Sequence, residues 1–186
     1  ISINNMKLKQ LYSEGDFEYL KKFVDINVDD SKKIKLDGWI KTYRNQTDLI
    51  FMALNDGSTQ KNIQVIFDKN NNFCNKVEEI FNKLNKLSVG SSVELEGILV
   101  KPPDTSKELV ELHITDIFYI GIIEDRSSYI LSKGRVKPNV MRKYQHLRCK
   151  TNYFAALMKI RSRALQALNL FFDNNYFYHV DPNVIT

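Results

Sequence analysis

Apolar and polar residues alternate in three segments in the first half of the chain. The segment KIKLDGWIKTYRNQ (33–46) predicts a long strand, and DLIFMALND (48–56) and KNIQVIFD (61–68) predict two more around an Asp-Gly-Ser turn. Gly38 lies inside the first segment, which predicts a bulge or a sharp bend there. The hairpin should bury one face, and its alternation allows Phe51 and Gln64 to lie on the other.

A helical pattern and two more strand patterns follow. VGSSVELEGILVKP (89–102) and LVELHITDIFYIG (109–121) alternate as strands, joined by a polar loop. The apolar residues before them recur at the spacing of an amphipathic helix: Phe73, Val77, Ile80, Phe81, Leu84 and Leu87. Three strands, a helix and two strands is the order of the five-stranded Greek-key barrel called the OB-fold, and the pattern assigns residues 33–121 to it.

The pattern of the second half predicts a hinge and the start of another domain. Residues 122–150 show no periodicity over a length unusual for a loop, so we expect a hinge. A long helix is predicted from Thr151 or Asn152 to Asn174–Asn175, where a left-handed cap is expected, followed by a strand that Pro182 interrupts. One helix and one strand do not bury both of their faces. The predicted organisation is therefore an extension (1–32), a barrel (33–121), a basic hinge (122–150) and the beginning of an α+β domain (151–186), mainly β overall.

The net charge of +5 is unevenly distributed. Residues 1–125 carry 20 acidic and 16 basic residues. Between Arg126 and Phe172 there is no acidic residue, while eleven are basic: Arg126, Lys133, Arg135, Lys137, Arg142, Lys143, Arg148, Lys150, Lys159, Arg161 and Arg163. A stretch of one sign repels itself unless a polyanion lies nearby, which favours contact with nucleic acid over the alternative of a solvated basic linker.

The sequence does not indicate a membrane protein, a secreted protein, a metal site or a catalytic centre. No apolar run approaches the length of a membrane helix and the first residues lack a secretory signal, so we expect an intracellular protein. Cys74 and Cys149 have no CxxC or nearby His spacing, and neither a zinc site nor a disulfide is predicted. The three histidines show no metal or catalytic spacing, and no glycine-rich nucleotide motif is present. We predict no catalytic residue and no metal ligand in this segment.

Three segments resemble the class IIb aminoacyl-tRNA synthetases, and within them the asparaginyl-tRNA synthetases. They are GWIKTYRNQTDLIFMALNDGS (38–58), NIQVIF (62–67) and HLRCKTNYFAALMKIRSRALQALNLFFDNNYFYHVDPNVIT (146–186). The last is similar to motif 1 of class II enzymes, a long helix and a strand with a proline at a dimer interface, which Pro182 matches. The resemblance implies an anticodon-binding OB-fold, a hinge and the first helix and strand of the catalytic domain.

The resemblance also implies what the barrel would bind. By similarity, Phe51 stacks on the middle anticodon base, a uridine, while Arg44 and Gln64 hydrogen-bond to it. Glu111 matches a glutamate that helps to recognise the first anticodon base. We expect Lys133, Arg135 and Lys137 of the hinge to contact RNA phosphates.

Without the resemblance, each of these residues has a structural alternative. Phe51 could be a core residue, Gln64 and Glu111 could be solvated strand residues, and Arg44 could pair with Asp48. Trp39 follows the bend predicted at Gly38, and we expect it to be a core residue rather than an RNA contact. Tyr43 and Phe67 are assigned to barrel packing.

The function implied is that of the anticodon-binding part of a cytoplasmic, homodimeric asparagine–tRNA ligase. Such an enzyme uses ATP and Mg²⁺ to join asparagine to tRNA(Asn), and its ATP-binding motifs 2 and 3 match nothing in this chain. The segment should therefore be inactive alone and bind no cofactor. The alternatives are an aspartyl-tRNA synthetase of the same subclass and a noncatalytic OB-fold protein that binds single-stranded RNA.

Overall fold

The computed structural model describes residues 33–70, 76–102 and 110–183. The extension 1–32, the predicted helix residue Phe73, Cys74, most of the polar loop and residues 184–186 lie outside this part. The chain divides into two compact units, residues 1–136 and 137–186, and each is considered by itself. The boundary between them falls within the predicted hinge.

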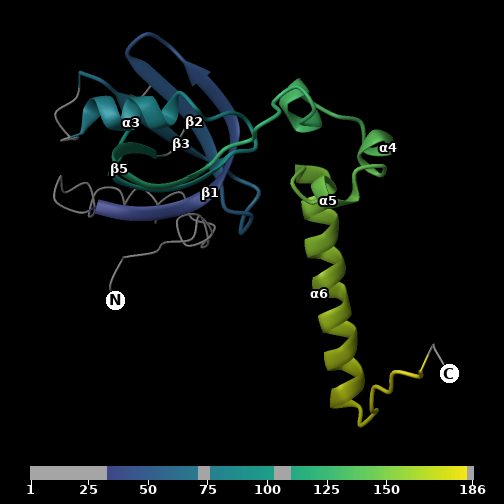
Figure 1. Ribbon diagram of the computed structural model, residues 1–186. Coiled ribbons are helices and arrows are strands. Elements are labelled where there is room, and N and C mark those ends of the chain that lie inside the picture. Colours follow the sequence, from purple (N-terminus) through teal and green to yellow (C-terminus); the bar gives the residue numbers. More distant parts are fainter. Residues whose placement is uncertain (1–32, 71–75, 103–109, 184–186) are drawn as a thin grey trace. The chain divides into compact units, whose positions relative to one another are not determined.

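Five strands of the first unit form a closed barrel in the order β1-β2-β3-β5-β4 (Figure 1). The strands are β1 (Lys33–Asn45), β2 (Leu49–Asn55), β3 (Ile63–Asp68), β4 (Ser92–Val100) and β5 (Glu111–Gly121). Neighbouring strands are antiparallel except β3 and β5, which are parallel. One helix, α3 (Val77–Leu84), connects β3 to β4. The predicted OB-fold with one inserted helix is confirmed.

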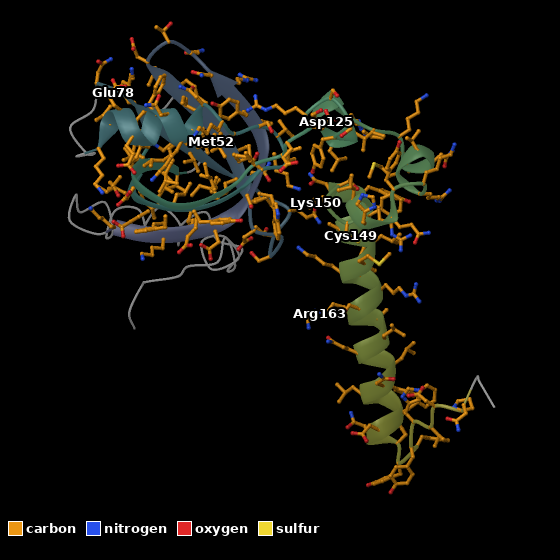
Figure 2. The ribbon with its side chains drawn as sticks, in the orientation of Figure 1. Met52, Glu78, Asp125, Cys149, Lys150 and Arg163 are labelled. Atoms are coloured by element: carbon orange, nitrogen blue, oxygen red, sulfur yellow. The ribbon has the colours of Figure 1, made fainter. Side chains whose placement is uncertain are left out.

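Alternate side chains of every strand fill the barrel, because successive residues of a strand point to opposite faces. Met52 of β2 lies in this interior (Figure 2) and is 2% exposed. Ile80 and Leu84 of α3 join the same apolar core. Tyr43, partly buried, packs against the core and donates a hydrogen bond from its hydroxyl to the Leu84 carbonyl oxygen, 3.0 Å away. The assignments of Tyr43 and Phe67 to barrel packing are confirmed, since Phe67 is 1% exposed.

Strand β1 closes the barrel because it pairs with β4 along its first half and with β2 along its second half. Trp39 has a partner in both neighbours, Ser92 and Asn55. The pairing shifts between Ile40 and Thr42, so the bulge lies one residue after Ile40. Of the two alternatives predicted at Gly38, a bulge or a sharp bend, the bulge is wrong in position. Gly38 serves close packing instead, since a Cβ there would lie 2.8 Å from the Asn55 carbonyl oxygen.

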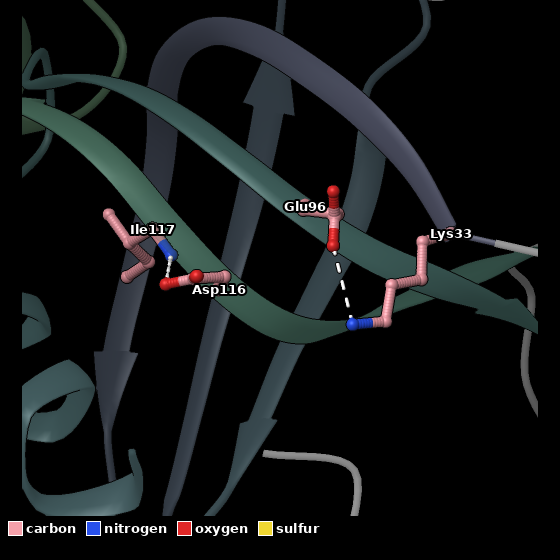
Figure 3. Close-up of polar contacts among 4 residues, drawn as sticks. All are labelled: Lys33, Glu96, Asp116 and Ile117. Carbon is pink, nitrogen blue, oxygen red and sulfur yellow. Dashed lines mark hydrogen bonds and ion pairs between the residues drawn. The ribbon is translucent and has the colours of Figure 1, made fainter. Parts of the chain in front are cut away.

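Two polar contacts accompany the closure on the β4 side (Figure 3). The Lys33 ammonium lies 3.4 Å from a Glu96 carboxylate oxygen across the β1–β4 pair. In β5, where the register with β4 shifts after Glu96, the Asp116 carboxylate accepts a hydrogen bond of 2.8 Å from the backbone N–H of Ile117. The Lys33 side chain is about half exposed, so the ion pair contributes about 1 kcal/mol or less, and the barrel depends on its core.

The segment after β5 is more ordered than its sequence predicts. The Arg126 guanidinium donates to the Lys86 carbonyl oxygen at 2.7 Å, which holds the start of the segment on the barrel. Asp125 accepts hydrogen bonds from the backbone and hydroxyl of Ser127, and the turn continues into the 3₁₀ helix η1 (Ile130–Lys133). The second unit adds two short helices, α4 (Pro138–Met141) and α5 (Gln145–Arg148). Such single turns depend on local hydrogen bonds, and a search for periodicity does not detect them.

The second unit consists largely of α6 (Asn152–Asn174), a helix of 23 residues with Thr151 as its N-cap. At its C-terminus the Tyr176 N–H bonds to the Asp173 carbonyl oxygen and the Phe177 N–H to that of Phe172, both at 3.0 Å. This is the Schellman arrangement, and its left-handed residue is Tyr176, with φ of 65°. The expectation of a left-handed Asn is therefore wrong by one position, although the helix ends where predicted.

Residues 177–183 form no strand, although the sequence predicts one there. A strand needs hydrogen bonds from a neighbour, and the described part of the second unit offers none. Phe154 is the one buried residue of α6 and Met158 is partly buried, while most of its other large apolar side chains are exposed, among them Leu157, Ile160, Leu165, Leu168, Phe171 and Phe172. Among the described residues, no helix is long and apolar enough to cross a membrane.

Candidate nucleic-acid interface

Four strands place eight side chains in two adjacent rows on the barrel. Strand pairing connects the members of each row directly, from β1 through β2 and β3 to β5. The first row is Thr42, Ala53, Gln64 and Glu111, and the second row is Arg44, Phe51, Ile66 and His113. Each row contains two of the four residues assigned to anticodon recognition, so residues up to 67 positions apart lie on neighbouring strands of one surface. We call this surface the two-row face.

The two-row face points away from the barrel interior. Ile50 and Met52, on either side of Phe51, are buried in the core, and alternation turns Phe51 outward. The same reasoning applies to Gln64, which lies between the buried Ile63 and Val65. Phe51 and Gln64 are both partly exposed. The core alternative for Phe51 is therefore excluded.

Arg44 is exposed and lies directly opposite Phe51 in the β1–β2 register. Directly paired residues of an antiparallel sheet have their Cβ atoms about 4.5–5.5 Å apart, so the guanidinium and the ring can engage one ligand together. Within the described residues Arg44 forms no ion pair, and its alternative pairing with Asp48 is not present. Its charge is thus available to a ligand at this surface.

Gln64 and Glu111 form a hydrogen bond across the parallel β3–β5 pair. The Gln64 side-chain amide nitrogen, Nε2, donates to the Glu111 carboxylate oxygen, Oε1, at 3.1 Å. Glu111 is 7% exposed, which corrects the alternative of a solvated strand charge. Gln64 and Glu111, for which the sequence predicted contacts with different bases, therefore form one hydrogen-bonded pair. Ala53, the smallest residue of their row, is the strand partner of Gln64.

His113 belongs to the two-row face, although the sequence assigns it no role. It pairs with Ile66, which in turn pairs with Phe51. Burial lowers the pKa of His113, and the negative charge of Asp68 partly offsets this effect. Its position two residues after Glu111 in an alternating strand was a signal that it shares the outer face.

Trp39 also departs from expectation, because it is 41% exposed rather than a core residue. It lines a shallow hollow with Asp37, Glu94 and Tyr119, at the other end of the β1–β2 pairing from Arg44. Trp39 precedes the bulge and alternates with the buried Leu36 and Ile40, so strand alternation itself turns it outward. The core interpretation failed because it relied on a bend at Gly38 to turn the ring inward.

The remaining predicted contacts lie outside the barrel. Arg135 and Lys137 are exposed, and so is Pro182 in the second unit. Lys133 ends η1, but its side chain lies outside the described part of the chain. Cys149 is an exposed free thiol. In the described ranges, no three His, Cys, Asp or Glu side chains lie together in a way that could hold a metal ion.

Comparison with known proteins extends the barrel assignment. Residues 34–120 match the family model described as the OB-fold nucleic acid binding domain. The chain is 34% identical over 155 residues to the asparaginyl-tRNA synthetase of Homo sapiens, a match that covers 83% of this chain and 30% of the human protein. It is 38% identical over 163 residues to the asparagine–tRNA ligase of Clostridium beijerinckii, covering 86% of this chain and 33% of that protein. The chain thus spans about a third of the length of these relatives.

Solved structures support the same fold. The asparaginyl-tRNA synthetase of Pyrococcus horikoshii superposes with a TM-score of 0.67 at 24% identity, over 83% of this chain and 35% of that one. A structure from Leishmania major described as a putative aspartyl-tRNA synthetase gives a TM-score of 0.71 at 19% identity, over 98% of this chain and 34% of that one. At such identities the likeness concerns the fold alone.

The lowered pKa of His113 predicts a pH-dependent contribution to stability. In the unfolded chain the imidazole takes up a proton near its usual pKa, about 6.5, whereas the folded protein takes it up only at lower pH. Between the two pKa values the unfolded state binds more protons than the folded state, so the free energy of unfolding should decrease as the solution is acidified through this range. Well above about pH 6.5 the ring is neutral in both states, and the contribution of His113 to stability is constant.

We expect His113→Gln to flatten this dependence. Urea unfolding of the 186-residue chain between about pH 7.5 and pH 5 should show a smaller loss of stability in the variant than in the original protein. His146→Gln, a change of an exposed histidine, serves as the matched control. Equal slopes for the original protein and His113→Gln would contradict the prediction.

Proposed function

We propose that this chain reads a tRNA anticodon: its barrel belongs to the OB-fold nucleic acid binding domain family, and its sequence is related over most of its length to asparaginyl-tRNA synthetases. The resemblance to that family found in the sequence is confirmed. Because the chain spans about a third of these relatives, the activity and the partners of the complete protein are part of the proposal.

The observation that carries the proposal is the two-row face. An aromatic ring, a guanidinium and a side-chain amide lie on neighbouring strands of one outer surface, and Arg44 pairs directly with Phe51. OB-folds bind oligonucleotides across the face around their second and third strands, which here are the strands that carry Phe51 and Gln64.

The chemistry of these groups suits an unpaired base. The Phe51 ring offers a stacking platform, worth about 1–3 kcal/mol per base and tolerant of base identity. Gln64 offers a donor and an acceptor on one planar group, which suits the edge of uracil, and Arg44 adds a charged fork of donors. The exposed Arg135 and Lys137 are the proposed phosphate contacts, together with Lys133. Glu111 takes part in base recognition as the hydrogen-bond partner of Gln64.

For the complete protein, we propose the ligation of asparagine to tRNA(Asn) in the cytoplasm, with ATP and Mg²⁺ as required by that reaction. No described residue of this chain is assigned to ATP or Mg²⁺. Charging of tRNA(Asn) by the complete protein is the direct assay. Charging of tRNA(Asp) instead would favour an aspartyl enzyme, and no charging at all would favour a noncatalytic RNA-binding protein.

Replacement of Phe51 by Ala should weaken RNA binding by about 5- to 150-fold, the value of one stacked base. The measurement is titration of the 186-residue chain with a short RNA hairpin whose loop carries GUU, the asparagine anticodon. A second titration uses a hairpin with GUC, the aspartate anticodon, which differs only in the third base. The ratio of the two affinities shows whether the chain prefers the asparagine or the aspartate anticodon.

The control for this experiment is Phe118→Ala. Phe118 is 48% exposed on β5 and lies under the Lys35 ammonium, 4.1 Å from its ring centroid. It has the same side chain as Phe51 and no place in the two-row face. Unchanged binding by Phe51→Ala, or an equal loss in Phe118→Ala, would contradict anticodon reading at this surface.

Charge neutralisation in the hinge should reduce the salt dependence of RNA binding. The barrel part is net acidic, so we expect phosphate contacts from the basic stretch that follows it. Replacing Lys133, Arg135 and Lys137 by Ala should flatten the plot of log affinity against log salt by about 0.7–0.9 per lost contact. The control replaces three other lysines by Ala and so removes the same charge: Lys33, Lys69 and Lys83. Each of these already pairs with a glutamate, so this variant should keep the original salt dependence. Identical slopes in the hinge variant and the original protein reject the idea.

We further propose that the second unit takes part in a homodimer, through the segment that contains Pro182. The exposed apolar residues of α6 support this, because Leu157, Ile160, Leu168 and Phe171 recur at helical spacing. Leu168→Glu should shift the mass measured by light scattering from dimer to monomer, whereas Arg163→Ala on the same helix should leave it unchanged. A purified chain that is monomeric at all concentrations would contradict dimerisation through this segment.

A further inference from the structure

The hydrogen bond between Gln64 and Glu111 determines which way the Gln64 amide faces. A carboxylate accepts hydrogen bonds and has none to donate, so only the NH₂ side of the amide can face it. The bond runs from Nε2 to the Glu111 Oε1 at 3.1 Å, which fits this requirement. The amide oxygen is thereby turned away from Glu111, and one N–H of Nε2 remains available beside it. The order of donor and acceptor that Gln64 presents is fixed.

Burial indicates that Glu111 acts through its neighbour. It is 7% exposed, so little of its carboxylate surface can touch a base, whereas Gln64 is partly exposed on the next strand. Parallel pairing of β3 and β5 holds the two residues directly side by side. A buried carboxylate needs a hydrogen-bond donor, and the amide of Gln64 is one.

We propose that Glu111 is a positioning residue that prevents the Gln64 amide from flipping, and that this gives the two-row face its preference for uracil over cytosine at the middle base. The inference rests on the proposed function and extends it to the origin of specificity. It gives Glu111 a role that differs from contact with the first anticodon base.

The argument follows from the edges of the two pyrimidines. Uracil presents a donor at N3 beside an acceptor at position 4, and cytosine presents an acceptor at N3 beside a donor at position 4. An amide that is free to rotate by half a turn can satisfy either base. A fixed amide satisfies one of them and opposes donor to donor and acceptor to acceptor in the other. Stacking on Phe51 does not distinguish the two, so the discrimination must come from the polar groups.

The test is Glu111→Gln, which keeps the size of the side chain but supplies a group that can donate or accept. Gln64 is then free to adopt both orientations. The original chain should bind a GUU hairpin more tightly than a GCU hairpin by about 5- to 100-fold, the range for one bidentate contact. In Glu111→Gln most of this preference should disappear, chiefly through tighter binding of the GCU hairpin. Thermal unfolding followed by circular dichroism checks that the variant is folded.

Two further variants separate positioning from a general effect. Glu94→Gln on β4 removes the same charge from a site outside the two-row face and should keep the preference. In a Gln64→Ala background, where no amide remains to be oriented, Glu111→Gln should leave the ratio of the two affinities unchanged.

The outcomes distinguish this inference from the proposed function. If the original chain prefers GUU and Phe51→Ala weakens binding, but Glu111→Gln retains the uracil preference, the positioning role is overturned while anticodon reading stands. An effect of Glu111→Gln on first-base preference alone, or an equal loss for every hairpin, overturns it too. If the original chain binds all hairpins alike, both the proposed function and this inference fail.

Discussion

The parallel pairing of β3 with β5 holds Gln64 beside Glu111, although they lie 47 positions apart in the chain. Antiparallel hairpins connect β1, β2 and β3 locally, and their loops are short enough to fix the register. β5 is separated from β3 along the chain by α3 and β4, and it pairs with β3 only in the closed barrel. The two-row face is therefore a consequence of barrel closure, and no hairpin alone could assemble it.

In the proposed function, affinity and specificity come from different parts of this chain. Residues 1–125, which include the barrel, carry 20 acidic and 16 basic residues, whereas the stretch from Arg126 to Phe172 contains only basic charges. Attraction of RNA phosphates is independent of sequence and suits that stretch, whereas the base-reading groups lie on the barrel. The barrel itself is nearly neutral, with 12 acidic and 11 basic residues in 33–121, so a polyanion gains little there from charge alone and must gain stacking and hydrogen bonds.

Local patterns predicted the strands, the outward positions of Phe51 and Gln64 and the core position of Phe67, because alternation is a property of short segments. Patterns failed where distant segments decide the outcome. Alternation from the buried Leu36 and Ile40 would place Arg44 inside, and the bulge after Ile40 turns it outward. The burial of Glu111 follows from the β3–β5 contact. The strand expected before and after Pro182 needs a partner strand that local sequence does not supply.

Stacking and amide recognition differ in how much geometric error they tolerate. A ring such as Phe51 gains from overlap with a base over a range of positions, because its attraction depends on contact area. The amide of Gln64 distinguishes bases only while its plane and its donor side stay fixed, since hydrogen bonds weaken steeply with misalignment. Specificity thus depends more strictly than affinity on the β3–β5 register and on the tightly packed core beneath it. In the proposed function, the closed barrel is what holds the flexible amide of Gln64 in the one orientation that reads a single base.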